Sequence, residues 1–165
     1  EEANNWYELL VNGVWTKDGV KKRVTDRVKA WYKQKFPGKT FTAEEKEFNE
    51  FKRKLGVTGH NWFQEIHNRW FDENGNRRTT ITSRSTKLSA TDETVYNKLE
   101  TYYAGLINKF SEKGVPLVFS EVMIYDSKEK EAGTLDLLII EESGRANIID
   151  WKFMSMSDKS TDIKI

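Results

Sequence analysis

The stretch Leu135–Ile140 constrains the fold more than any other part of the sequence, because it is apolar at every position except Asp136. A short run with apolar residues on both faces is typical of a strand that is covered on both sides. Two further runs rich in Val, Ile and Leu, at residues 115–125 and 146–153, are separated from it by Asp, Gly or Ser turns. We therefore predict three strands late in the chain, the middle one over residues 132–141.

Before this region, apolar residues recur at helical spacing. We predict helices over residues 18–35, 43–54, 60–71 and 91–113. The first helix should stop before Pro37, and Thr42 and Glu45 have the spacing of a capping box for the second. The segment 56–59, which begins and ends with glycine, should separate the second helix from the third. The polar stretch 72–90 predicts a loop or a weak hairpin.

The helices should each turn one apolar face inward. The residues predicted to face the core are Val20, Val24, Val28 and Trp31 in the first helix, Phe48 and Phe51 in the second, Trp62, Phe63, Ile66 and Trp70 in the third, and Val95, Leu99, Tyr102, Leu106 and Phe110 in the fourth, which Thr91 should cap. Helices followed by a small sheet indicate an α/β fold, with a mixed β-sheet flanked by helices and a helical N-terminal part at residues 1–55.

Composition excludes several classes of protein. The chain of 165 residues is 37% hydrophobic and 13% aromatic, so it can build a core and is not a disordered chain. It has no cysteine, which excludes disulfides, thiolate zinc sites and cysteine nucleophiles. No apolar run approaches the ~20 residues of a membrane helix, and no leader resembles a signal peptide. Because the chain does not begin with Met, we expect it to be part of something longer.

Charge is unevenly distributed. Residues 1–88 carry 18 basic and 12 acidic side chains, whereas residues 89–165 carry 9 and 14. This asymmetry suggests that the basic half binds a polyanion and the acidic half binds metal ions. Ordinary solvated surface is the alternative.

The carboxylates Asp136 and Asp150 fall within the predicted strands, where a charge needs a partner or a metal ion. If the hairpin pivots on Ser143, residues whose numbers sum to 286 oppose each other, and Asp136 opposes Asp150 with Cβ atoms ~5 Å apart. Lys152 should point to the same face as Asp150, because strand side chains alternate. Two carboxylates and an ammonium would then converge on one patch.

This set of side chains suits metal-assisted hydrolysis of phosphodiesters. Carboxylates bind Mg²⁺ or Mn²⁺, which polarises a phosphate and acidifies a bound water. Lys152 could orient or deprotonate the attacking water, or stabilise charge on the phosphate. The alternative is a purely structural ion pair at a strand end, between Lys152 and one of the two aspartates.

Three motifs carry a resemblance to a known family: Gly133-Thr-Leu-Asp136, Asp150-Trp-Lys152, and an upstream Gly56-Val-Thr-Gly-His60. Their order resembles the PD-(D/E)XK nuclease superfamily, and in particular its RecB-type and phage exonuclease branch. The resemblance implies a restriction-endonuclease-like core over residues 56–165.

The resemblance also implies roles for individual residues. Asp136, Asp150 and His60 would be metal ligands, Lys152 the catalytic lysine, and Glu121 the acid of the preceding strand. A true His60 ligand would favour Mn²⁺ over Mg²⁺. The branch usually has a further Gln-x-x-x-Tyr helix after the lysine, and since Gln occurs here only at 34 and 64, we expect that C-terminal helix to be missing.

Other residues are assigned by position. His67 should be structural or support the site, and Trp151 should lie in the core. Four arginines near the predicted loop could contact phosphates: Arg69, Arg77, Arg78 and Arg84. The basic residues of 17–54, interleaved with aromatic residues such as Trp31 and Tyr32, could track a nucleic-acid backbone, although rings at helical spacing are more often core.

These observations predict a Mg²⁺- or Mn²⁺-dependent deoxyribonuclease. The resemblance implies an exonuclease of DNA end processing, recombination or repair. We expect single- or double-stranded DNA as the partner, with no membrane and no nucleotide cofactor. The resemblance alone places it in the cytoplasm of a bacterial or phage-infected cell. Two alternatives stay open: an inactive nuclease-fold module that binds nucleic acid or protein, and a structural domain docked by residues 1–55 into a larger phage or helicase assembly.

Overall fold

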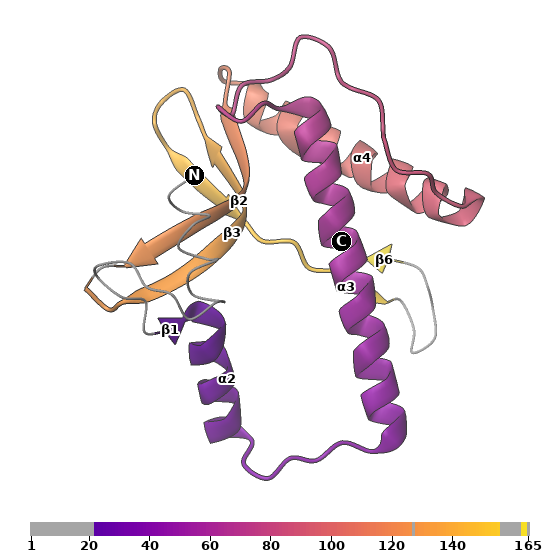
Figure 1. Cartoon of the computed structure of the whole chain (residues 1–165). Helices are drawn as coiled ribbons and strands as arrows, with labels where there is room; N and C mark the ends of the chain where they lie inside the picture. The colour runs from indigo at the N-terminus through magenta and orange to yellow at the C-terminus, as the bar shows by residue number, and fades with distance from the viewer. Residues whose placement is uncertain (1–21, 127, 156–162, 165) are drawn as a thin grey trace. The chain divides into compact units, whose positions relative to one another are not determined.

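A computed structural model describes residues 22–126, 128–155 and 163–164 (Figure 1). The chain divides into two compact units, and each is described by itself. The first unit combines the described residues up to Phe41 with Glu121–Leu135. The second combines Thr42–Ser120 with the described residues from Asp136 onward.

The larger β-sheet of the described residues has four strands. They are β1 (Lys22–Arg23), β2 (Leu117–Asp126), β3 (Glu131–Ile140) and β4 (Ala146–Ile149). β3 pairs with the other three, parallel to β1 and antiparallel to β4. A separate antiparallel pair is formed by β5 (Met154–Ser155) and β6 (Ile163–Lys164). Together with the helices, this small sheet agrees with the predicted α/β class.

The hairpin of β3 and β4 has the predicted register. Leu137 pairs with Ile149 and Ile140 pairs with Ala146, so the numbers of opposed residues sum to 286. The turn is closed by the Glu141 amide, which donates to the Arg145 carbonyl over 2.8 Å. β4 ends at Ile149, however, so the prediction of a strand through residue 153 is wrong.

In the first unit, helix α2 (Val24–Lys35) follows β1 directly. The Arg23 amide donates to the Asp26 carboxylate over 3.1 Å and satisfies one free amide at the helix start. The predicted helix over 18–35 is therefore wrong at residues 22–23, which form β1, and residues 18–21 lie outside the described part.

The apolar stripe predicted for this helix does not form a core. α2 buries none of its side chains, and Val28 and Trp31 are 58% and 53% exposed. Its first turn packs on the sheet, where Val24 lies against Gly133 of β3. Near it, Arg27 forms an ion pair with Glu131 over 2.6 Å.

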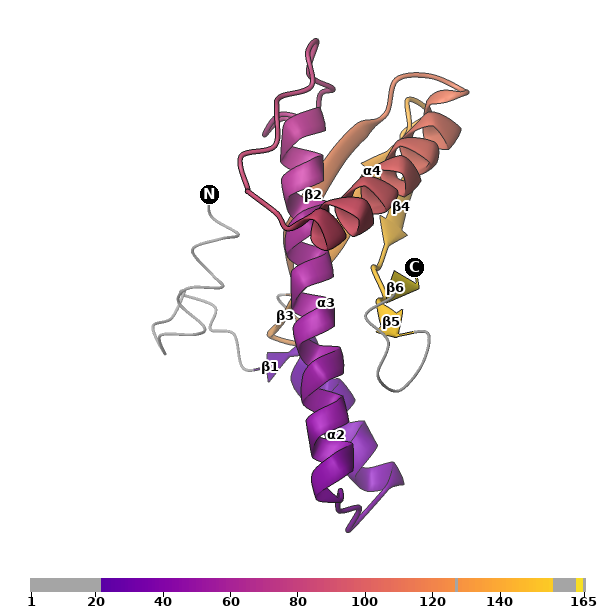
Figure 2. The same cartoon turned by 90° about the vertical axis from the view of Figure 1, so that its right-hand side faces the viewer.

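Helix α3 (Ala43–Trp70) is the main element of the second unit (Figure 2). Thr42 and Glu45 form the predicted capping box, since each side chain accepts a hydrogen bond from the other residue's amide. The predicted break at residues 56–59 is wrong, because the helix continues through both glycines. A glycine costs a helix only about 1 kcal/mol relative to Ala, and tertiary packing offsets that. The predicted domain boundary after residue 55 falls inside this helix.

Helix α4 (Ala90–Ser111) crosses the C-terminal half of α3 (Figures 1 and 2). Its N-cap is Ser89, whose hydroxyl accepts from the Asp92 amide over 3.2 Å, and not the predicted Thr91. The side chains of α4 that are buried are Tyr96, Leu99, Tyr103 and Ile107. Of the predicted stripe only Leu99 is among them, and Tyr102 is 46% exposed. The buried face is thus rotated by about one residue from the predicted one.

Aromatic rings fill the core of the second unit. Phe63 of α3 stacks on Trp151 with centroids 4.2 Å apart, which confirms Trp151 as a core residue. Trp70 meets Tyr103 of α4 edge-on at 5.8 Å. The segment between α3 and α4 is a loop with one bridge, Phe71 to Arg77, as the polar sequence predicts. No helix in the described ranges is both long and apolar enough to cross a membrane.

Candidate metal centre

Asp136 and Asp150 stand at the point where β3 and β4 stop pairing. They are one step beyond the last pair, Leu137 with Ile149, so the confirmed register places them opposite each other. Their side chains are 15% and 60% exposed. The prediction that both carboxylates lie within strands is therefore wrong for Asp150, because β4 ends at Ile149.

Asp136 is held by two contacts. Its Oδ2 accepts the Trp151 amide over 2.8 Å and lies 3.2 Å from Nε2 of His60. Burial raises the pKa of the Asp136 carboxyl, but the contacts with His60, the Trp151 amide and the Asp150 carboxyl outweigh it and lower the pKa overall. Asp136 is thus an ionised carboxylate at neutral pH.

His60 reaches this carboxylate from α3. Its Nδ1 lies 2.8 Å from the Gly56 carbonyl one turn earlier, and its ring meets the Phe153 ring edge-on at 5.1 Å. A carbonyl only accepts hydrogen bonds, so Nδ1 carries a proton and donates it. This contact fixes the ring and leaves Nε2 directed at Asp136. A histidine that ligates a metal is held in the same manner by a hydrogen bond from its other nitrogen.

The donor set at this point fits a divalent cation. If Nε2 is unprotonated, its lone pair faces a carboxylate oxygen at 3.2 Å, and the two repel unless a positive charge joins them. Either a proton on Nε2 or a metal ion would supply this positive charge. Adjacent ligands of an octahedral ion with bonds of ~2.1 Å are ~3.0 Å apart. The separation of Nε2 and Oδ2 agrees with that spacing, and Asp150 can add a second carboxylate.

Lys152 is paired with Asp150. Its Nζ lies 2.7 Å from Asp150 Oδ2, although both residues lie beyond the end of β4. The hydrogen bond to Asp150 raises the pKa of the Lys152 ammonium. The ion pair is exposed, at 79% for Lys152. The predicted convergence of the three groups is present, and so is the ion pair of the structural alternative.

The arrangement is not a preformed cage. Among the described residues, no group of three or more His, Asp or Glu is arranged to hold a metal ion. The candidate centre therefore consists of the His60–Asp136 pair, with Asp150 in contact with Asp136.

Glu121 is the first residue of the second segment of the first unit. Its φ is 52°, in the left-handed region that few residues other than glycine adopt. Such a conformation costs on the order of 1 kcal/mol, and backbone outliers of this kind cluster at functional sites. A role for Glu121 stays a prediction.

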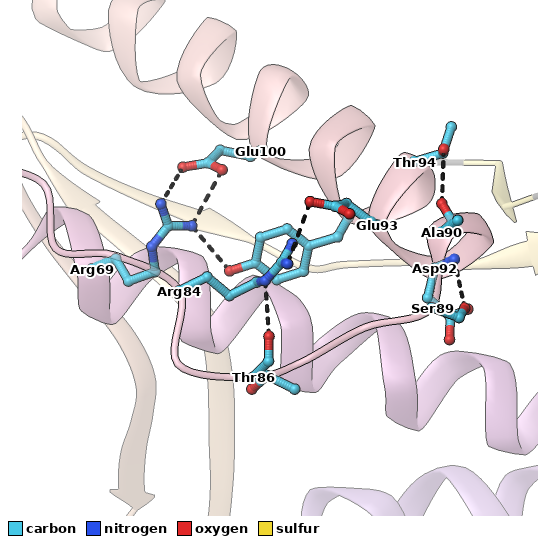
Figure 3. A network of polar contacts seen from close by, with 10 residues as sticks. Arg69, Arg84, Thr86, Ser89, Ala90, Asp92, Glu93, Thr94 and Glu100 are labelled. Carbon is cyan, nitrogen blue, oxygen red and sulfur yellow. Dashed lines mark hydrogen bonds and ion pairs between the residues drawn. The ribbon is translucent and has the colours of Figure 1, made fainter.

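Two of the four predicted phosphate-binding arginines stabilise the packing of the loop on α4 (Figure 3). Arg69 pairs with Glu100 over 3.1 Å and donates to the Tyr96 hydroxyl over 3.0 Å. Arg84 lies over the Tyr96 ring at 5.2 Å and pairs with Glu93 over 3.4 Å. Each has an acidic partner, which accounts for its position without a nucleic acid.

The other two arginines, Arg77 and Arg78, are exposed. The Arg77 guanidinium lies 4.9 Å from the centroid of the Trp70 ring, and Arg78 donates to the Asn68 carbonyl over 2.9 Å. These contacts are to a ring and a carbonyl and not to an acid. Phosphate binding by these two residues stays a prediction.

Sequence patterns did not identify the groups that fix the site. The Gly56 carbonyl and the Trp151 amide are backbone atoms, and only the spacing of four residues between Gly56 and His60 could have suggested the first. Glu65 lies five residues after His60 on α3. Its Oε1 is buried with no hydrogen-bond partner among the described residues, while Oε2 accepts the Thr86 hydroxyl over 2.6 Å.

Comparison of the chain with protein-family models, with curated proteins and with solved structures finds no match.

Proposed function

We propose that this chain is a metal-dependent nuclease that hydrolyses the phosphodiester bonds of DNA. The observation that carries the proposal is the contact of His60 Nε2 with Asp136 Oδ2 at 3.2 Å, with Asp150 and Lys152 beside it. The ligand types are those that Mn²⁺ or Mg²⁺ accepts. The finer assignment, an exonuclease with a restriction-endonuclease-like core that acts in DNA end processing, recombination or repair, rests on the motif resemblance.

His60, Asp136 and Asp150 would hold the ion, which when bound would polarise the scissile phosphate and acidify a water. The Gly56 carbonyl accepts the Nδ1 proton of His60 and so orients the ring with Nε2 facing Asp136, where Nε2 would bind the ion once it carries no proton. The raised pKa of Lys152 makes it an ammonium at neutral pH. It is therefore suited to bind a phosphate oxygen and stabilise its charge, and poorly suited to act as a base.

Cleavage of labelled single- and double-stranded DNA with Mn²⁺ or Mg²⁺ tests the proposal. Asp150→Asn should abolish cleavage, because it removes a ligand charge and the partner of Lys152. Asp92→Asn, which removes an exposed acid from the first turn of α4, is the matched control and should cleave like the unchanged protein. Equal cleavage by both variants would overturn the proposal.

Metal binding is a second, separate measurement. Calorimetric titration with Mn²⁺ should show binding to the unchanged chain and to Asp92→Asn, and none to Asp136→Asn. Binding of equal strength to all three proteins would place the ion elsewhere.

An inactive module that only binds nucleic acid or docks into an assembly is the second candidate. It is favoured by the Lys152–Asp150 ion pair and by the absence of a preformed cage in the described residues. A chain that binds DNA equally with and without Mn²⁺, and cleaves none, would support it.

A further inference from the structure

The aromatic and basic residues of segment 24–41 form a surface that the nuclease site does not use. Between Val24 and Phe41 the sequence has five basic residues and a single acid, Asp26. It also has four aromatic residues, all exposed: Trp31, Tyr32, Phe36 and Phe41. The aromatic–basic surface, as we name this segment, belongs to the first unit. The candidate metal centre belongs to the second.

These rings are exposed, so they are not core residues, which is the usual explanation of aromatic residues at helical spacing. Aromatic residues at helical spacing normally mark a buried face, yet Trp31 is 53% exposed and α2 buries no side chain. Exposed aromatic clusters mark places where a partner binds. The rings therefore point to a ligand rather than to the core.

Basic side chains lie directly over the rings. Lys35 Nζ is 4.8 Å from the centroid of Trp31, and Lys39 Nζ lies 5.7 Å from Phe36 and 5.2 Å from Phe41. Tyr32 and Phe36 are themselves in contact, with centroids 4.9 Å apart. Flat rings and positive charges thus alternate along one surface.

This combination matches the chemistry of a single-stranded nucleic acid. Unpaired bases stack on aromatic rings, and phosphates pair with the lysines between them. A duplex offers phosphates but no free base faces. A lipid surface is a poorer match, because an interfacial helix has an uncharged apolar face, whereas Lys35 lies within the face of Val28 and Trp31.

We infer that the aromatic–basic surface binds single-stranded DNA, with bases stacked on Trp31 and Tyr32 and phosphates paired with lysines such as Lys29 and Lys33. The choice of DNA rests on the proposed function. The surface would hold the strand outside the site of cleavage, and it would do so without a metal ion.

Binding is measured by fluorescence anisotropy of a labelled oligothymidylate of about 15 nucleotides, with the full chain in EDTA. Trp31→Ala should weaken binding about five- to 150-fold, the effect of losing one stacked base. Trp31→Phe keeps a ring and should restore binding to within about threefold. A Trp31→Ala variant that binds as the unchanged chain does would overturn the inference, and so would a Trp31→Phe variant as weak as Trp31→Ala.

Charge is tested separately through the dependence on salt. Replacing Lys29 and Lys33 by Gln should lower the slope of log K against log salt by about 1.4, because each phosphate contact on a single strand contributes ~0.7. The matched control replaces two exposed lysines of α4, Lys98 and Lys109, and should leave the slope unchanged. An equal decrease in both double variants would show an effect of net charge alone and would contradict a specific surface.

Two further measurements distinguish binding of DNA from binding of a membrane and from the nuclease activity. Vesicles of phosphatidylserine and phosphatidylcholine should not bind the chain. Vesicle binding that Trp31→Ala abolishes, with no affinity for the oligonucleotide, would assign the surface to a membrane instead. Binding is measured in EDTA and cleavage with Mn²⁺, so a failure of this inference and a failure of the proposed nuclease activity give different results.

Discussion

The buried His67 predicts how stability should change in acid. Its Nδ1 lies 2.8 Å from the Tyr103 hydroxyl, its ring stacks on Phe71 at 5.4 Å, and the residue is 4% exposed. Burial, together with the nearby charge of Arg78, lowers the pKa of the His67 imidazole from 6.5 to about 4. The folded protein therefore holds this ring neutral.

The sign and size of the effect follow from linkage. Above pH 6.5 the ring is neutral in both states and contributes no pH dependence. As pH falls from 6.5 to about 4, the unfolded chain takes up a proton that the folded chain refuses, so stability decreases. At ~1.36 kcal/mol per pKa unit, the total loss is about 3 kcal/mol.

Urea unfolding between pH 7 and 4 measures this loss against the variant His67→Asn, whose amide can still meet the Tyr103 hydroxyl. The variant should be less stable at pH 7, but its stability should fall less steeply in acid. The difference between the two curves should thus shrink by about 3 kcal/mol toward pH 4. A difference that stays constant over this range would refute the argument from burial.

Three further predictions concern packing, capping and metal linkage. Gly59→Ala should lower the unfolding free energy by about 1–3 kcal/mol in urea melts, because the new methyl group would lie 2.7 Å from the Phe153 ring; an unchanged midpoint would mean that the ring moves freely. Ser89→Ala should cost about 1 kcal/mol, since it leaves the Asp92 amide at the start of α4 without its acceptor, and Ser89→Asp is expected to restore stability. In thermal melts, Mn²⁺ should raise the midpoint of the unchanged chain but not that of Asp136→Asn, and an equal rise in both would exclude Asp136 as a ligand.

The hairpin shows what the sequence could predict about the site. Its register depended on one assumption, the pivot at Ser143, and the alternation of strand side chains then placed Asp136 opposite Asp150. The predicted end of the last strand, residue 153, was less accurate, because a run of apolar residues does not mark where the hydrogen bonds between strands stop. Lys152 still contacts Asp150 although neither residue is in a strand, because the two are only two residues apart and the lysine side chain is long.

The helices show where local patterns are insufficient. Glycine spacing predicted a break at Gly56, but the packing of Phe63 and Trp70 on α4 and Trp151 keeps α3 continuous. The apolar stripe of α2 was correctly periodic and wrongly assigned to the core, because periodicity reports a common face and not what covers it. Neither the continuity of α3 nor the exposure of α2 can be predicted from a few neighbouring residues.

The continuity of α3 has a mechanical consequence. The helix extends for about 42 Å at ~1.5 Å per residue, and His60 lies about 25 Å from its first residue. Its first half is largely exposed, whereas its second half is anchored among aromatic rings. Because the helix is unbroken from Ala43 to His60, no loop lies between its exposed half and the residue that contacts Asp136.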